Sequence, residues 1–174
     1  RLVSDWSSDV CSSDLASTGF ERSLLALLER FPVPLSCLCL ELTETVAISH
    51  SRRTSRLFER LRGMGCHIAI DDFGVGFQSF ERLKQIPVDV IKIDGSFVRD
   101  MLKSERDREL VRASVEVARA FAAQTVAEYV GDAATAQLLR ELGVDWGQGF
   151  WFGHPVPIAD AMGLAGNADP DRSP

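Results

Sequence analysis

Acidic side chains follow short apolar runs at several points in this sequence, and this pattern can create a metal site. Glu41 lies in the apolar run that ends at Leu42, and Asp71 and Asp72 follow the run that ends at Ile70. A divalent cation makes two adjacent aspartates tolerable where their charges would be costly to desolvate. Oxygen ligands suit magnesium or manganese, so we expect Mg²⁺ or Mn²⁺ as the cofactor. The alternatives are an exposed Asp-Asp turn and a purely structural role for Glu41.

Lys92 and Glu128 extend this acidic set. Lys92 lies inside an apolar run, between Ile91 and Ile93, where a lysine needs a charge partner. Among carboxylates its ammonium group can stabilise a phosphate, hold a water molecule or balance charge. Glu128 directly follows another short apolar run and supplies a further carboxylate. Together these residue types suit phosphodiester hydrolysis with two metal ions, which activate water and stabilise the leaving oxygen.

The chain alternates short apolar runs with stretches of helical period, which indicates an α/β fold with a parallel sheet. The expected strands span residues 38–42, 67–70, 88–93, 125–127 and 144–149. The expected helices span residues 20–31, 52–62, 79–84, 106–121 and 133–142. Polar residues stand at or just after the ends of five successive strands: Glu41, Asp71 with Asp72, Lys92, Glu128 and Gln148. Such residues converge on one face in a (β/α)8 TIM-type barrel, and no Gly-rich nucleotide loop follows a strand. We therefore favour the barrel over a doubly wound sheet.

The composition fits one soluble globular domain. Of the 174 residues, 45% are hydrophobic and 25% are charged, with a net charge of −6. No apolar run is long enough to span a bilayer, and an acidic chain does not suit broad contact with DNA. The four cysteines show neither zinc-finger nor secreted spacing. Cys37 and Cys39, two apart in an expected strand, are predicted to be small core residues in a reducing cytoplasm.

The motifs of this sequence occur in the same order as those of a known family. ELTE, DDFG-x-G, K-x-D, A-E-x-V and Q-G, within residues 38–155, closely resemble consecutive motifs of the EAL domain family. The resemblance implies a (β/α)8 barrel that hydrolyses the bacterial second messenger cyclic di-GMP to linear pGpG with Mg²⁺ or Mn²⁺. It also implies cyclic di-GMP as the ligand, a GGDEF or sensor domain in the same parent chain, and dimerisation near residues 72–79.

The same resemblance implies a role for each matching residue. It implies these metal ligands: Glu41, Asp71, Asp72 and Glu128. It implies these catalytic residues: Lys92, which positions the attacking water, and Glu128. It implies these substrate-binding residues: Asp94 and Gln148. It makes Glu44 the anchor of the loop over residues 73–79.

The sequence departs from the family pattern at three points. The glutamate of the E-A-L signature and the asparagine ligand on the next strand would precede residue 16. We therefore expect an incomplete barrel with about the last five β/α units, its N-terminal strands missing, and little catalysis by this fragment alone. Gly131 stands where the family usually carries a second glutamate, and Val75 and Gln78 replace the usual threonine and serine.

Three segments are expected. Residues 1–15 show no helical or strand period, and residues 5–15 match, without a mismatch, the translation of a common sequencing-adapter sequence. We interpret residues 1–15 as a non-native leader, with a native disordered leader as the alternative. Residues 16–160 form the partial EAL domain, and the Gly-, Asp- and Pro-rich residues 161–174 form a disordered tail.

Three functions compete at this stage. The first is a cyclic-di-GMP phosphodiesterase, favoured by the acidic residues and Lys92. The second is a degenerate EAL domain that binds the nucleotide as a non-catalytic receptor, favoured by Gly131. The third is an unrelated barrel enzyme such as an aldolase, in which Lys92 would form a Schiff base without a metal.

Overall fold

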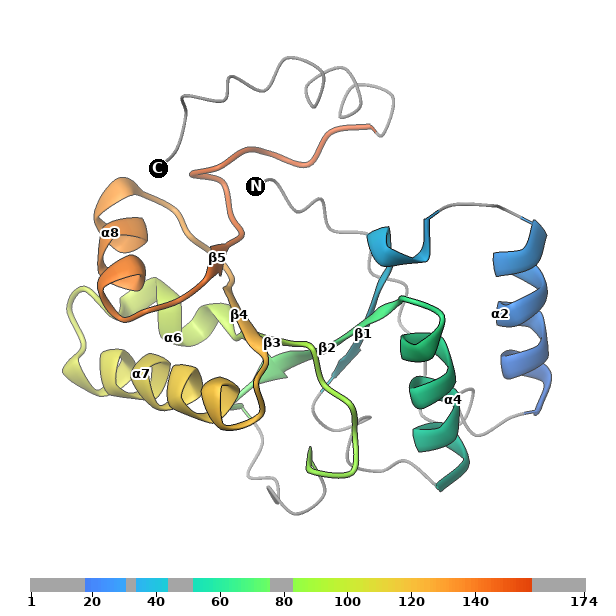
Figure 1. Cartoon of the computed structure of the whole chain (residues 1–174). Coiled ribbons are helices and arrows are strands. Elements are labelled where there is room, and N and C mark those ends of the chain that lie inside the picture. The colour runs from blue at the N-terminus through green and yellow to red at the C-terminus, as the bar shows by residue number, and fades with distance from the viewer. Residues whose placement is uncertain (1–17, 31–33, 44–51, 76–82, 158–174) are drawn as a thin grey trace.

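The computed structural model describes residues 18–30, 34–43, 52–75 and 83–157 (Figure 1). Within them no helix is long and apolar enough to cross a membrane. The helices and strands, in chain order, are α2 (Thr18–Arg30), the 3-10 helix η1 (Leu35–Cys37), β1 (Cys39–Thr43), α4 (Arg52–Gly63), β2 (His67–Phe73), β3 (Val90–Ile93), α6 (Gly95–Asp100), α7 (Glu105–Ala120), β4 (Gln124–Ala127), α8 (Ala133–Glu141) and β5 (Trp146–Gly147).

The sheet has five parallel strands in the order β1-β2-β3-β4-β5, with each strand paired to the next in sequence. The strand order never reverses, so right-handed crossovers place the connecting helices on one face of the sheet. Figure 1 shows the strands as an arc with the labelled helices along its outer side. This arrangement confirms an α/β fold of the barrel type, in which the described strands form part of the barrel wall.

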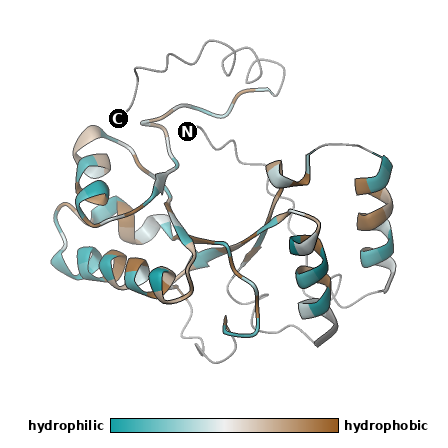
Figure 2. Cartoon of the chain, in the orientation of Figure 1, coloured by the Kyte–Doolittle hydropathy of each residue, from teal (hydrophilic) through white to brown (hydrophobic). Residues whose placement is uncertain are grey.

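The main core lies between the sheet and the outer helices. Ile68, Ile70 and Ile91 are fully buried on the face of the sheet that packs against Phe58 of α4 and Ala118 of α7. In Figure 2 both the strands and the helices α4 and α7 carry hydrophobic as well as hydrophilic residues. Alternate strand residues point to the opposite face. Glu41, Asp71 and Lys92 alternate with the outward-facing residues and therefore lie on the inner face of the arc.

All five expected strands form, and most of their ends agree within a few residues. β2 is longer than expected because it continues through both aspartates to Phe73. α6 was not expected, because six residues are too few to show a helical period. Its sequence signal is Asp94, whose Oδ1 accepts a hydrogen bond from Ser96 N at 2.8 Å as the N-cap. Most of the short helix expected over 79–84 lies outside the described residues.

The prediction for Cys37 and Cys39 was wrong, because both side chains are exposed. Cys37 belongs to the 3-10 helix η1 rather than to a strand. Cys39 begins β1, which is the outermost strand of the described sheet, so no described strand covers it on that side. Cys66, in contrast, is only 2% exposed and packs with the helices as a small apolar residue.

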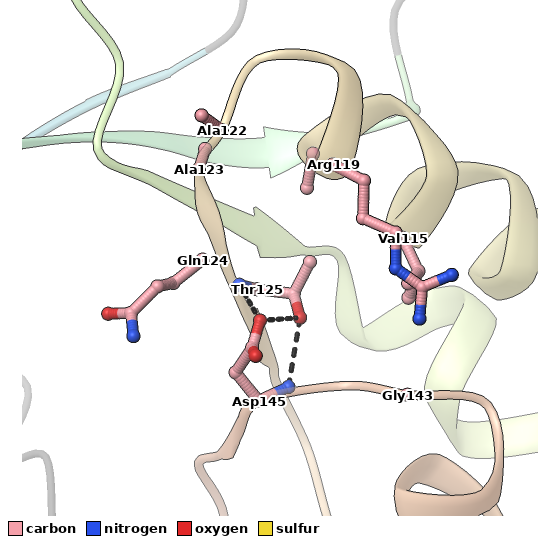
Figure 3. Close-up of a pocket in the computed structure, with 9 residues that line it drawn as sticks. Val115, Arg119, Ala122, Ala123, Gln124, Thr125, Gly143 and Asp145 are labelled. Carbon is pink, nitrogen blue, oxygen red and sulfur yellow. Dashed lines mark hydrogen bonds between the residues drawn. The ribbon is translucent and has the colours of Figure 1, made fainter.

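Two aspartates tie neighbouring strands together at their amino ends. Asp89, just before β3, accepts a hydrogen bond from Ile68 N of β2 at 3.0 Å. Asp145, just before β5, accepts hydrogen bonds from both the backbone N and the hydroxyl of Thr125 in β4, each at 2.8 Å (Figure 3). Both aspartates follow a valine in sequence, so the same local device occurs twice.

We predict that Asp145→Ala lowers the free energy of unfolding by about 1–3 kcal/mol, because it leaves a buried backbone N–H without its acceptor. Thr125 is only 1% exposed, so water cannot easily replace the carboxylate. Urea unfolding followed by circular dichroism measures the change. Asp100→Ala, at an exposed position, is the control and should change stability by less than about 0.5 kcal/mol. Equal effects of the two substitutions would contradict the role of Asp145.

The pocket in Figure 3 lies at this same edge of the sheet. It has a volume of about 180 Å³, and its lining includes Arg119, Gln124 and Asp145. Gln124 begins β4, whereas Glu128 follows its last residue. The pocket is therefore at the end of the strands opposite to the acidic residues, and in a barrel that end serves stability rather than catalysis.

Candidate metal centre

Lys92 is the centre of the acidic group at the carboxyl ends of the strands. Its Nζ lies 2.9 Å from Glu41 Oε2, 2.9 Å from Asp71 Oδ1 and 2.7 Å from Glu128 Oε1. These partners come from β1, β2 and the residue after β4, so the lysine joins three other strands of the arc. The lysine side chain is only 3% exposed. The structure thus supplies the charge partners that the sequence required for Lys92.

The charge state of Lys92 follows from these contacts. Burial alone lowers the pKa of the ammonium group, because it disfavours the charged form. Hydrogen bonds to Glu128, Asp71 and Glu41 outweigh burial and raise the pKa above its ordinary value. Lys92 therefore carries a positive charge at neutral pH. A Schiff-base lysine needs a neutral amine, so this environment does not favour the aldolase hypothesis.

Three carboxylates beside Lys92 form a group that can hold a metal ion. Asp71, Asp72 and Glu128 each offer an oxygen, and these oxygens all lie within 4.8 Å of one another. Adjacent strand residues normally point to opposite faces. Here the pairing of β2 with β3 shifts between Ile70 and Phe73, and Asp72 has a φ of +54°. This local irregularity lets both aspartates contribute to one cluster.

The donor set fits a hard divalent cation. All three candidate ligands are carboxylate oxygens, which suit Mg²⁺ or Mn²⁺. Glu41 brings a fourth carboxylate to the group, because it forms an ion pair with Lys92. The lysine itself supplies one positive charge. Four carboxylates and one ammonium group leave excess negative charge, and a divalent cation would offset it. The residues present therefore match the metal that the sequence predicted.

The pKa values of two cluster residues reflect this crowding. Burial, followed by the charges of Asp71 and Asp94 and a hydrogen bond with Asp94, raises the pKa of Asp72. Burial also raises the pKa of Glu128, although the hydrogen bond and charge of Lys92 oppose it. In both residues the ionised form is less favourable than in a free carboxylate, and a bound cation would offset this cost.

We predict that Mn²⁺ affinity falls as the pH is lowered, beginning above the ordinary aspartate pKa of 3.8. A raised pKa means that protons compete with the metal at a higher pH than for a free carboxylate. Electron paramagnetic resonance of free Mn²⁺, recorded over a pH series, measures this dependence. Asp72→Asn should weaken binding and flatten the profile, whereas Asp100→Asn, at an exposed site, should change neither. An affinity that stays constant down to pH 3.8 would contradict the assignment.

The remaining predicted site residues are placed as follows. Asp94 lies beside the metal cluster through its contact with Asp72, and it also caps α6. Gln148 is half-buried, and its backbone N–H donates to Ala127 O at 2.8 Å, which holds it next to the end of β4. Glu44 lies outside the described residues, so its role as a loop anchor stays a prediction.

Gly131 and Tyr129 complete the surroundings of Glu128. Gly131 is exposed, and a Cβ there would meet nothing closer than Tyr129 O at 4.0 Å, so the position has room for a side chain. Tyr129 did not stand out in the sequence, where it is only the variable residue of A-E-x-V. Only the structure draws attention to Tyr129, because a φ of +57° is uncommon for a residue other than glycine.

Proteins with similar sequences include several that are named cyclic di-GMP phosphodiesterases. The chain is 34% identical over 151 residues to the cyclic di-GMP phosphodiesterase PdeB of Shewanella oneidensis, covering 87% of this chain and 18% of that protein. It is 33% identical over 153 residues to the cyclic di-GMP phosphodiesterase PdeA of Borreliella burgdorferi, covering 88% and 23%. The chain spans about a fifth of the length of the first curated relatives that it matches.

Solved structures agree with these relatives. The EAL domain of Mycobacterium smegmatis DcpA matches with a TM-score of 0.82 and 34% identity, covering 91% of this chain and 71% of that one. The PaMucR phosphodiesterase in complex with c-di-GMP matches with a TM-score of 0.80 and 33% identity, covering 87% and 62%.

The match to the family itself runs over most of the chain. The family model described as "EAL domain" matches residues 7–155, which include every predicted site residue and the acidic cluster around Lys92. The match begins within residues 1–15, so the expected boundary at residue 16 stays a prediction. The chain belongs to the EAL domain family.

Proposed function

We propose that the protein carrying this chain hydrolyses cyclic di-GMP to linear pGpG in bacterial signalling, with Mg²⁺ or Mn²⁺ as the cofactor. The observation that carries the proposal is the acidic cluster of Asp71, Asp72 and Glu128 beside the buried Lys92. Two relatives with this domain are named cyclic di-GMP phosphodiesterases, which supports the choice of substrate.

The chain's own residues would share the work as follows. Asp71, Asp72 and Glu128, with Glu41 on the far side of Lys92, would hold the metal. A bound divalent cation supplies Lewis-acid polarisation of the phosphate and lowers the pKa of water. Lys92, as a cation, keeps the carboxylates of Glu41, Asp71 and Glu128 together through its three contacts. The raised pKa of Glu128 suits its carboxylate to accept a proton from the attacking water.

The substrate and its setting follow from the same proposal. Asp94 and Gln148 would contact the nucleotide, because the first touches the metal cluster and the second lies at the end of β4. An intracellular messenger as substrate would place the site in the cytoplasm. We also propose a GGDEF or sensor domain elsewhere in the parent chain and a homodimer as the assembly. The 174-residue chain alone is expected to turn over slowly compared with the parent.

A non-catalytic receptor for cyclic di-GMP is the second candidate, and Gly131 is the observation that favours it. The position is exposed and has room for a side chain, so it leaves the site one carboxylate short of the family pattern. If the parent only binds the nucleotide, binding without cleavage should be observed. Gly131→Glu would then be expected to increase metal affinity, with cleavage appearing only in that variant.

The test is incubation of the full-length gene product with cyclic di-GMP and Mn²⁺, with the products separated by chromatography. Linear pGpG should appear, and it should be lost with a chelator and in Glu128→Gln. Glu59→Gln, on the exposed face of α4, is the matched control and should retain activity. Tight binding without cleavage would favour the receptor, and neither binding nor cleavage would overturn both candidates.

A further inference from the structure

Tyr129 combines exposure with a strained backbone at the edge of the metal centre. Tyr129 is 64% exposed, so much of this large, mainly apolar residue is in contact with solvent. Its φ of +57° lies in the left-handed region, which disfavours any residue with a Cβ. Such strain persists where the surroundings fix the conformation, and it gathers at functional sites. The position therefore calls for a role beyond packing.

The surface of α6 holds the tyrosine ring in place. A Cβ at Gly95 would overlap the Tyr129 ring, so the glycine allows the ring to lie directly on the helix backbone. Arg99, one turn further along α6, places its guanidinium carbon 4.7 Å from the ring centroid. Gly95 and Arg99 thus support the ring as a fixed platform, and the cation adds an attractive contact to the ring face.

The platform lies directly beside the groups that would bind phosphate. Tyr129 follows Glu128, whose Oε1 is 2.7 Å from Lys92 Nζ. The Asp94 that precedes Gly95 contacts Asp72 of the metal cluster. An exposed aromatic ring next to a metal centre for phosphate suits a ligand that carries both a phosphate and a flat ring. Nucleotides have this composition, because the base extends away from the phosphate on the sugar.

We propose that Tyr129 is a substrate-binding residue that stacks on a guanine base of the bound nucleotide, while the phosphate lies at the metal centre. The inference rests on the proposed function and extends it to the recognition of the base. Stacking uses the π-face that every base has, so the tyrosine hydroxyl is not required. Removing the ring should weaken nucleotide binding, whereas removing only the hydroxyl should not.

The first test uses the fact that Tyr129 is the only tyrosine in the 174-residue chain. Incorporation of 3-fluorotyrosine therefore labels this ring alone, and ¹⁹F NMR reports on its surroundings. Titration with GMP in Mg²⁺ should shift the fluorine resonance, whereas ribose 5-phosphate, which has no base, should leave it nearly unchanged. An equal response to both ligands, or none to either, would overturn the inference.

The second test measures the affinity of full-length protein for cyclic di-GMP by calorimetry. Tyr129→Gly should raise Kd by about 5- to 150-fold, the range expected for loss of one base-stacking contact. Glycine also accepts the left-handed backbone, so this variant should fold. Tyr129→Phe keeps the ring and should stay within about 3-fold of the wild type, a rescue that a structural role of the hydroxyl would prevent.

The outcomes separate this inference from the proposed function. Wild-type affinity in Tyr129→Gly would overturn the stacking role and leave the proposed function standing. A wild-type protein that binds no cyclic di-GMP would overturn both. A weaker Tyr129→Gly together with an intact Tyr129→Phe supports the inference.

Discussion

Replacing Lys92 with methionine should lower the free energy of unfolding by about 3 kcal/mol in metal-free buffer, the lower end of the range for breaking a buried ion pair. The substitution removes the ammonium group that contacts Glu41, Asp71 and Glu128. The carboxylates would then repel one another. Their side chains are 16–28% exposed, so solvent screens part of the repulsion and the effect should not reach the upper end of the range.

Addition of Mn²⁺ should recover more stability in Lys92→Met than in the wild type, because the freed carboxylates attract the cation more strongly. Thermal unfolding with and without Mn²⁺ measures both effects. Lys103→Met, at an exposed position, is the matched control and should lack both. A Lys92→Met variant that matches the wild type in chelator would contradict the central position of this lysine.

Replacing Gly149 with alanine should destabilise the chain by at least about 3 kcal/mol, because no room exists for the new methyl group. A Cβ at this position would overlap the backbone N and O of Val130, and backbone atoms cannot move aside as a flexible side chain can. The φ of +155° adds strain for any residue with a Cβ. The same substitution should also displace Gln148 and thereby weaken nucleotide binding.

Gly63→Ala provides the control for this effect. Gly63 ends α4, and a Cβ there would meet no atom within 4 Å. Alanine should therefore be neutral or stabilising by up to about 1 kcal/mol, as expected for a helical position. Urea unfolding of both variants measures the contrast. A Gly149→Ala variant as stable as Gly63→Ala would contradict the close approach of Val130.

The sequence predicted the strands and the polar residues at their carboxyl ends well, because both depend on patterns among neighbouring residues. An apolar run followed by a carboxylate predicts both the strand and the end at which the polar group stands. Asp71, Lys92 and Glu128 are brought together as expected, since parallel strands in sequential order direct their carboxyl ends to one edge.

Other features depended on tertiary contacts that no local pattern encodes. The irregular pairing that directs both Asp71 and Asp72 to one cluster depends on the register between β2 and β3. The exposure of Cys39 depends on which strand lies at the edge of the described sheet. The platform of Tyr129 depends on Gly95, which is 34 positions away in the sequence. Residue type and spacing alone could not indicate these contacts.

We expect a divalent cation to bind between Asp71, Asp72 and Glu128 beside Lys92. The most direct test is anomalous diffraction at the manganese edge from crystals of the protein soaked with Mn²⁺. We expect an anomalous peak within bonding distance of oxygens from these three carboxylates, and its loss in Asp71→Asn. Manganese bound elsewhere, or a peak unchanged in Asp71→Asn, would contradict it.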